Sequence, residues 1–174
     1  TYGSHNVYLN DISPDGKKLL CSTSKSDITR CPFSLSSLFE IDLATLLADT
    51  LVAWDAYLGS ASYSPDGKQL LVTGSPSAFG GIGKNCGEHP IANDFDTQAF
   101  IMDLATKKVQ AITRDFNPTV SPVQWNRVDG CIYFDTTDGD CRHIYRYVPK
   151  TGGFEMLPLE EDVITSFTLA NDNP

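Results

Sequence analysis

The sequence predicts an all-β protein, a partial β-propeller of three four-stranded antiparallel blades followed by the first strand of a fourth. Three observations lead to this fold class. The turn sequence Ser-Pro-Asp-Gly-Lys at 13–17 returns 51 residues later at 64–68. Each copy runs into an apolar stretch, and a third, degenerate copy lies at 126–130. Four short strands per unit, repeated about every 50–60 residues, are typical of propeller blades.

A second repeated element follows the first one. Residues 38–45 match residues 99–106, and the third version spans 143–147 and ends in Pro-Lys-Thr-Gly-Gly at 149–153. The apolar and polar residues alternate in these segments, which indicates strands with one face directed at a core. Within the turns, Pro presets φ at the second position and Gly accepts the positive φ that such turns require.

Each unit therefore reads as four strands, the first of which lies before the Pro-Asp-Gly turn. The expected second strands are 17–23, 68–74 and 131–136; the third are 37–43, 98–104 and 143–148; the fourth lie near 50–54, 108–113 and 153–157. The segment 163–169 is expected to be the first strand of a fourth unit. A β-sandwich is the alternative, although its strands need not return in the same order three times.

We expect one propeller domain over 1–174, with blades at about 5–56, 57–115 and 116–160 and the start of the next at 162–170. Propellers typically close with about 4–8 blades, so three blades cannot complete a ring. The parent protein should hold more blades, or the chain should pair with another copy of itself. Because the chain opens on Thr rather than Met, we expect a fragment of a longer reading frame. Self-association through the open blade faces is a hypothesis that follows.

The composition excludes several classes of partner. The chain has 174 residues, 41% hydrophobic and 20% charged, which is ordinary for a soluble globular domain. Its 13 basic residues are scattered and outnumbered by 22 acidic ones, which argues against nucleic acid and anionic membranes as partners. No apolar run approaches the roughly 20 residues that span a bilayer. Five cysteines without a Cys-x-x-Cys pair, and three histidines distant from them, predict no metal site and no cofactor.

The second unit carries an unusually long link between its second and third strands, from residue 75 to 97. A loop of this length inside a compact domain is typically functional or disordered. It should lie on the propeller face that carries the connections between blades, and it contacts either a substrate or a neighbouring domain, or it is a surface decoration. The candidate substrate-facing or partner-facing residues are Phe79, Lys84, Asn85, Glu88, His89 and Asp94. A metal site at Glu88 and His89 with Asp94 and Asp96 is less plausible than a solvated loop.

Motifs for catalysis are absent. The glycine-rich segment 80–84 fails the Walker pattern at Ala78 and Asn85, and it fails the dinucleotide pattern at Cys86. No Gly-x-Ser-x-Gly nucleophile elbow occurs, and no helical segment follows one. We therefore predict no catalytic residue in this chain.

Several segments resemble known propellers. Residues 63–68 (Tyr-Ser-Pro-Asp-Gly-Lys) resemble the blade motif of TolB-like propellers. Further segments look like the N-terminal propeller of bacterial prolyl oligopeptidase family serine peptidases, of the dipeptidyl or acylaminoacyl peptidase type. These are 74–83 (GSPSAFGGIG), 96–103 (DTQAFIMD), 115–118 (DFNP) and 123–127 (VQWNR). The resemblance covers residues 60–160 well and the first 60 more loosely.

The resemblance implies a parent with an α/β-hydrolase domain, which holds the catalytic triad and acts on short peptides while the propeller restricts access. Glu88 is a candidate for holding the free amino end of a peptide, since a carboxylate pairs with an ammonium group. It also implies a periplasmic or secreted location. The alternatives are a TolB-like protein-binding propeller without enzymatic activity, and a propeller lyase or glycan-cleaving enzyme with inward-facing His and Arg in its central channel.

Overall fold

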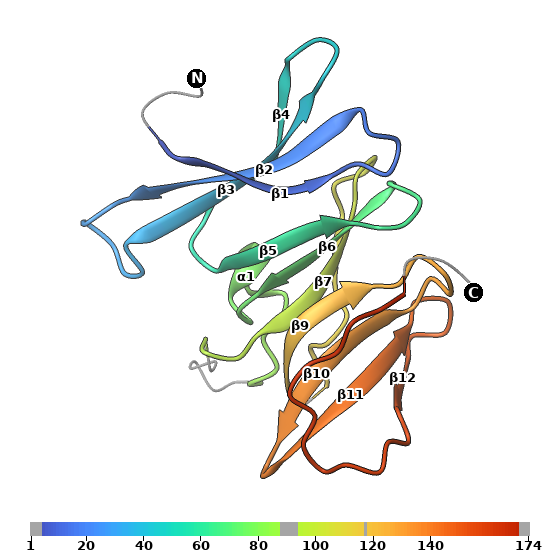
Figure 1. Ribbon diagram of the computed structural model, residues 1–174. Coiled ribbons are helices and arrows are strands. Elements are labelled where there is room, and N and C mark those ends of the chain that lie inside the picture. The colour runs from blue at the N-terminus through green and yellow to red at the C-terminus, as the bar shows by residue number, and fades with distance from the viewer. Residues whose placement is uncertain (1–4, 88–93, 117, 171–174) are drawn as a thin grey trace.

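The computed structural model describes residues 5–87, 94–116 and 118–170 and confirms the predicted partial propeller. Three four-stranded antiparallel sheets follow one another along the chain, ordered β1-β2-β3-β4, β5-β6-β7-β8 and β9-β10-β11-β12 (Figure 1). The strands are β1 Val7–Ile12, β2 Lys18–Ser26, β3 Ser34–Asp42, β4 Ala48–Asp55, β5 Leu58–Tyr63, β6 Gln69–Gly74, β7 Gln98–Asp103, β8 Val109–Ala111, β9 Thr119–Trp125, β10 Ile132–Asp138, β11 Cys141–Val148 and β12 Gly153–Met156.

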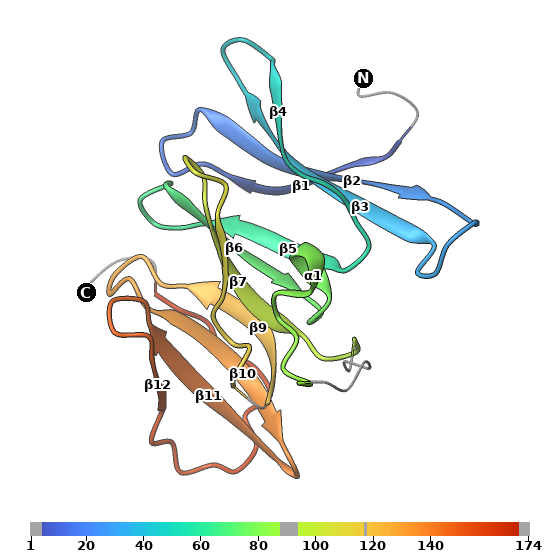
Figure 2. The same ribbon diagram turned by 180° about the vertical axis from the view of Figure 1, so that it is seen from behind.

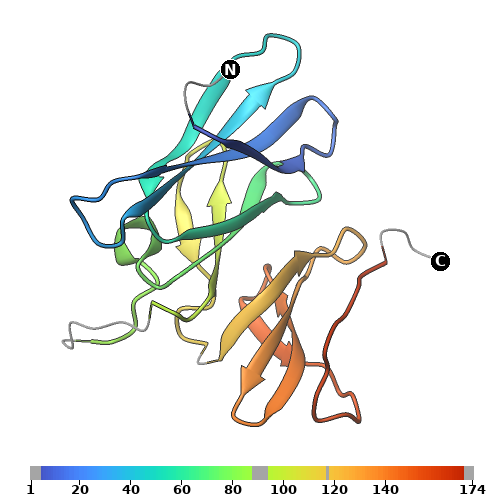
Figure 3. The same ribbon diagram turned by 60° about the vertical axis from the view of Figure 1, so that its left-hand side comes forward.

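The three sheets are stacked face to face, as the view in Figure 3 shows, and apolar clusters fill the spaces between them. The first cluster joins the first two blades through residues such as Leu20 and Leu70, and the second joins the last two blades through residues such as Leu71 and Phe134. The middle sheet is therefore buried on both faces. This explains why its second strand reads as a continuous apolar run rather than an alternating one.

The Ser-Pro-Asp-Gly turns form as predicted, with the serine as the organising residue. Ser64 is buried, and its hydroxyl donates to Asp66 at 2.7 Å and accepts the N–H of Gln69 at 3.0 Å. Ser13 makes the equivalent bonds to Asp15 and Lys18 in the first blade. Gly67 stands at φ +68°, in the left-handed region where a side chain would add strain. Local side-chain bonds thus fix where each second strand begins.

Two elements differ from the expected boundaries. The hairpin of β2 and β3 is longer than predicted. Its strands were expected to end at residue 23 and begin at residue 37, but they pair as far as Ser26 opposite Ser34. The long link contains a short helical turn, α1 (Ala78–Gly81), where we expected irregular chain. Ala78 fits there because its side chain is fully buried in the first cluster. Phe79 and Gly80 within α1 have left-handed φ values of 54° and 75°, so the segment is a turn without the apolar periodicity that would predict a helix.

The segment 163–169 enters the position of a further inner strand. The N–H of Ile164 donates to the carbonyl of Arg142 at 3.0 Å, just as Val120 at the start of β9 donates to Thr97 at 3.1 Å. Among the described residues the segment forms no ladder beyond one parallel bridge between Arg142 and Val163. It is an extended segment in the place of the fourth blade's first strand, with no second strand beside it in the described part of the chain.

Two general findings complete the description. All five cysteines are free thiols. The helical residues that the structure describes include no segment with the length and apolar character needed to cross a bilayer.

Phe134 should be a large contributor to stability. Its fully buried ring lies 5.5 Å from that of Phe116 and 6.1 Å from that of Phe154, in the cluster between the last two blades. Phe134→Ala should lower the free energy of unfolding by about 3–5 kcal/mol, measured by urea denaturation of residues 1–174. Phe95→Ala, at a ring that is 98% exposed, is the control and should change it by less than about 0.5 kcal/mol. Equal effects would contradict the assignment of this core.

Candidate functional site

The connections of the three blades gather on two opposite faces. Because the strands of each sheet are antiparallel, the first-to-second and third-to-fourth turns share one edge, which we call the turn face. The second-to-third links and the crossovers between blades share the other edge, which we call the loop face. Backbone bonds place the long link on the loop face, since Ser75 N–H donates to the carbonyl of Tyr57 in the first crossover at 3.0 Å. Figure 2 shows α1 beside the start of β5.

The first part of the long link is fixed to the blades. The Asp55 carboxylate accepts the N–H of Tyr57 at 2.8 Å and the N–H of Phe79 at 2.7 Å, which ties the crossover to α1. The Phe79 ring lies 5.1 Å from the ring of Phe100 in β7. Gln98 donates its side-chain N–H to the carbonyl of Gly83 at 3.0 Å. A Cβ at Gly83 would lie 2.3 Å from the Gln98 Oε1 atom, so a larger residue here would displace the Gln98 side chain.

The last part of the link borders a cavity of about 360 Å³, which we call the loop-face cavity. It lies between the inner strands of the second and third blades, and its lining includes Tyr57, Thr73, Ser75, Asp94, Asp96 and Ser121. Asp94 accepts a hydrogen bond from the Ser75 hydroxyl at 3.1 Å. Among the described lining residues two are acidic and none is basic, so a cationic or hydrogen-bond-donating group suits this cavity best.

The structure places the six candidate residues in different surroundings. Phe79 is half-buried and packs in the core, where its role is structural. Lys84 and Asn85 are exposed, and Asp94 reaches the loop-face cavity. Glu88 and His89 lie outside the described residues. Within the described ranges, no three His, Cys, Asp or Glu side chains gather closely enough to hold a metal ion.

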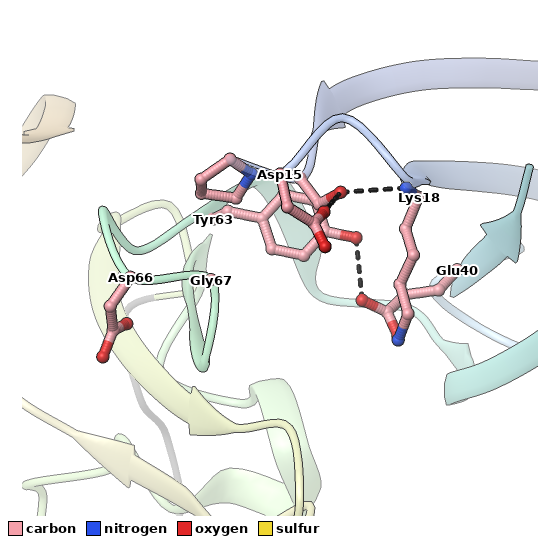
Figure 4. A pocket seen from close by; sticks show the side chains of 8 residues that line it. Asp15, Lys18, Glu40, Tyr63, Asp66 and Gly67 are labelled. Carbon is pink, nitrogen blue, oxygen red and sulfur yellow. Dashed lines mark hydrogen bonds and ion pairs between the residues drawn. The ribbon is translucent and has the colours of Figure 1, made fainter.

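A second pocket of about 360 Å³ opens on the turn face between the first two blades, and the sequence analysis missed it (Figure 4). Its polar centre is Glu40, which is only 5% exposed. The Tyr63 hydroxyl donates to Glu40 Oε1 at 2.7 Å, and the Lys18 ammonium donates to Glu40 Oε2 at 2.9 Å. The only signal of this arrangement in the sequence was a glutamate between Phe39 and Ile41, in the apolar half of β3.

The charge state of this pocket argues against acid–base catalysis. Burial, followed by the hydrogen bond to Glu40, raises the pKa of Tyr63 far above its ordinary value. The hydrogen bond to Glu40 likewise raises the pKa of Lys18. Both groups therefore keep their protons near neutral pH, whereas a general acid or base works best with a pKa close to the operating pH. The three side chains act as a fixed donor–acceptor set.

The equivalent position between the second and third blades is apolar. Strand register places Ile101 opposite Leu71 as Glu40 lies opposite Leu20. Trp125 precedes its turn as Tyr63 does, and both Ile101 and Trp125 belong to the second cluster. The polar set is thus a variant of a repeated inter-blade contact, and we assign it a structural role.

Comparison with known proteins supports the fold at low sequence identity. No family model matches the sequence, and no curated protein matches it. TolB from Acinetobacter baumannii is 22% identical with a TM-score of 0.61, covering 91% of this chain and 34% of that protein. An oligogalacturonate lyase from Vibrio parahaemolyticus is 16% identical with a TM-score of 0.66, and the match covers 90% of this chain and 42% of that protein. An acylaminoacyl peptidase from Pyrococcus horikoshii is 16% identical with a TM-score of 0.53, and the match covers 87% of this chain and 24% of that protein.

Fold and comparisons together define the class of protein: this chain is a three-bladed part of a β-propeller. It spans less than half the length of each of these three structures. TolB-like propellers and acylaminoacyl peptidases are both among its structural neighbours, so the likeness alone does not distinguish their functions.

Tyr63→Phe should destabilise the chain, because it leaves the buried Glu40 Oε1 without its donor. We expect a loss of about 1–3 kcal/mol in the free energy of unfolding, measured by urea denaturation. Tyr8→Phe, at a ring that is 53% exposed, is the matched control and should be neutral. The double variant Glu40→Ile with Tyr63→Trp copies the pair found between the next two blades and should restore most of the loss. If the double variant loses as much free energy of unfolding as Glu40→Ile and Tyr63→Trp lose together, the two inter-blade positions are not equivalent.

Stability should also fall at alkaline pH, in part through Tyr63. Its pKa is raised on folding, so the folded protein retains a proton that the unfolded chain releases above about pH 10. The contribution is therefore complete below that pH and decreases as the pH rises further. Urea midpoints measured from pH 8 to pH 11 should fall less steeply for Tyr63→Phe than for the wild type. Burial also raises the pKa values of Tyr133 and Tyr147, so a residual slope is expected. If the urea midpoints of Tyr63→Phe and the wild type fall equally steeply with pH, Tyr63 does not contribute to the alkaline loss of stability.

Proposed function

We propose that this chain is the non-catalytic propeller segment of a serine peptidase and shapes the access of short peptides to a separate α/β-hydrolase domain of the same parent chain. The single observation that carries the proposal is the long link of the second blade. Its first part is fixed to the blades through Asp55 and Phe79, and its last part borders the acidic loop-face cavity. A loop whose first part is held by the blades and whose last part borders a cavity is suited to selecting which peptides reach the hydrolase domain.

The chemistry of the cavity agrees with a peptide substrate. A free peptide amino end is an ammonium group at neutral pH, and carboxylates form charge-assisted hydrogen bonds with it. Asp94 and Asp96 supply two carboxylates at the rim of the cavity, and Glu88 stays a predicted third. Such binding needs no cofactor. The parent's location in the periplasm or outside the cell belongs to the same proposal and rests on the family resemblance.

The second candidate function is a TolB-like propeller that binds a protein partner without enzymatic activity. The likeness to TolB over 91% of this chain favours it. The two functions differ in what the complete reading frame encodes. The peptidase proposal requires a downstream α/β-hydrolase domain with a Gly-x-Ser-x-Gly elbow, whereas a TolB-like protein ends soon after the ring is complete.

The test uses the product of the complete reading frame. It should hydrolyse chromogenic dipeptide substrates, and Asp94→Asn should raise KM about tenfold for substrates with a free amino end, which corresponds to about 1.4 kcal/mol. Substrates with a blocked amino end should be unaffected. Asp140→Asn, at an exposed aspartate on the hairpin between β10 and β11, is the control and should leave both KM values unchanged. Residues 1–174 alone should show no turnover above buffer.

Three results would overturn the proposal. The first is a reading frame without the nucleophile elbow. The second is an equal effect of Asp94→Asn on free and blocked substrates. The third is turnover by residues 1–174 alone, because the proposal places every catalytic group in the separate hydrolase domain.

A further inference from the structure

We propose that a pocket at the outer strands of the second and third blades binds a primary alkylammonium group, from a lysine side chain or a free aliphatic amine. This pocket, which we call the rim pocket, has a volume of about 370 Å³ and lies between β8 and β12. Its lining includes Gln110, Ala111, Phe116, Tyr147, Gly152 and Phe154. It shares no lining residue with the loop-face cavity, so the inference does not depend on the peptidase proposal.

The first two blades show how a lysine joins outer strands at the equivalent place. Lys107 lies in the turn between β7 and β8 with a left-handed φ of 54°. Its ammonium group donates to the Asp49 carboxylate at 3.1 Å and to the carbonyl of Thr50 at 3.0 Å, and both acceptors belong to β4. An alkyl chain with a terminal ammonium group therefore bridges the first two blades.

Gly152 takes the place of Lys107 in the third blade. Each residue follows a threonine, Thr106 or Thr151, in the turn between the third and fourth strands. Gly152 has the same left-handed conformation, with φ at 71°, and a Cβ added to it would meet no atom within 4 Å. Because glycine has no side chain, the third blade sends no ammonium group across to the second blade from this position.

The strand register places equivalent acceptors on the second blade. Gln110 in β8 has the register position of Asp49 in β4, and Ala111 has the position of Thr50. The side-chain oxygen of Gln110 can accept a hydrogen bond where Asp49 does so with its carboxylate. The second blade therefore presents acceptors for an ammonium group to the rim pocket, although the turn of the third blade supplies none.

The Ala111 carbonyl points away from its own sheet, as the Thr50 carbonyl does. Ala111 and Phe100 form a pair without mutual hydrogen bonds, because the N–H of the next residue, Ile112, donates to the carbonyl of Ala99 at 3.0 Å. In such a pair the backbone groups of an edge strand are directed outward. The carbonyl of Ala111 is thus placed to accept a hydrogen bond from a ligand in the rim pocket.

Tyr147 adds a hydroxyl group that packing does not explain. The residue is only 4% exposed and lines the rim pocket, and its hydroxyl has no hydrogen-bond partner among the described residues. Buried hydroxyl groups normally have a partner, as the Tyr63 hydroxyl has in Glu40. Met102 is the equivalent residue of the second blade, so the contact between blades requires no hydroxyl there. An ammonium group in the rim pocket would donate to this hydroxyl.

Aromatic rings and charge suit the rest of such a ligand. The rings of Phe116 and Phe154 are stacked with centroids 4.7 Å apart, and the Tyr147 ring lies 5.1 Å from that of Phe154. Rings of this kind pack against methylene groups and attract a cation over their faces. Among the described lining residues Asp115 is the acidic one and none is basic. Asp115 is exposed and paired with Arg114, so its contribution should be small.

The test titrates residues 1–174 with amines and measures binding by isothermal titration calorimetry. The probe for a free amine is n-pentylamine, and the probe for a lysine side chain is lysine amide acetylated on its α-amino group. Both should saturate one site, and the tighter of the two identifies the source of the ligand. Norleucine amide acetylated in the same way has the same alkyl chain without the ammonium group. It should bind at least about tenfold more weakly than the lysine amide.

Two variants locate the binding. Gly152→Lys gives the third blade the lysine of the second, which should fill the rim pocket and abolish amine binding. Gly139→Lys, at φ 64° on the hairpin between β10 and β11, is the matched control and should bind as the wild type does. Tyr147→Phe removes only the hydroxyl and should weaken amine binding about tenfold. It should not lower the thermal unfolding midpoint, since this hydroxyl has no partner among the described residues.

Each other outcome would overturn the proposal. If neither amine saturates a site, or if the norleucine amide binds as tightly as the lysine amide, the rim pocket does not recognise an ammonium group. If Gly152→Lys binds amines as the wild type does, the binding lies elsewhere. If Gly152→Lys does not fold, Tyr147→Phe decides the question. An unchanged affinity of Tyr147→Phe for both amines, or a lower unfolding midpoint, would then contradict the role assigned to the hydroxyl.

Discussion

Burial of the middle sheet on both of its faces is the constraint on which the rest of this structure depends. Leu70 and Leu71 are neighbours in one strand, yet Leu70 belongs to the first cluster and Leu71 to the second. Sheets with two apolar faces must be stacked in series, and a series of twisted sheets joined by short crossovers turns about an axis. The crossovers, the turn face and the loop face are all consequences of that stacking.

The polar groups at the interfaces refine this arrangement rather than drive it. Glu40 and Tyr63 come from different blades, and each satisfies a buried atom of the other, so the pair defines how the first two blades meet. Asp135 and Arg142 are paired on the far side of the third blade, where one oxygen of Asp135 and the Nε of Arg142 have no hydrogen-bond partner among the described residues. Buried ion pairs contribute little net stability, and their value lies in excluding other alignments. The apolar clusters supply the stability.

Local signals explain which parts of the fold were predictable. The Ser-Pro-Asp-Gly turns and the alternating strands depend on residues within five positions of each other, so the sequence shows them directly. The contact between Glu40 and Tyr63 joins two blades, and α1 depends on Ala78 reaching a cluster formed by distant strands. The periodic pattern of apolar residues in the sequence does not predict contacts between residues so far apart in the chain. The long link stays a predicted site. Within it Phe79 packs against the core, and the position of Asp96 at the loop-face cavity emerged only from the geometry.

The first part of the long link is fixed to the blades, and its backbone shows how. Phe79 stands at φ 54° beside Gly80 at φ 75°, so a bulky residue adopts the left-handed conformation at a cost. Such strain persists only where the surroundings over-determine it. Here Asp55 holds the Phe79 N–H, and Phe100 holds its ring. Because residues 75–83 are anchored in this way, substitutions at Asp94 or Asp96 should alter the lining of the loop-face cavity without disturbing the blades. Under the proposed function, the first part of the link gives these two carboxylates a constant position.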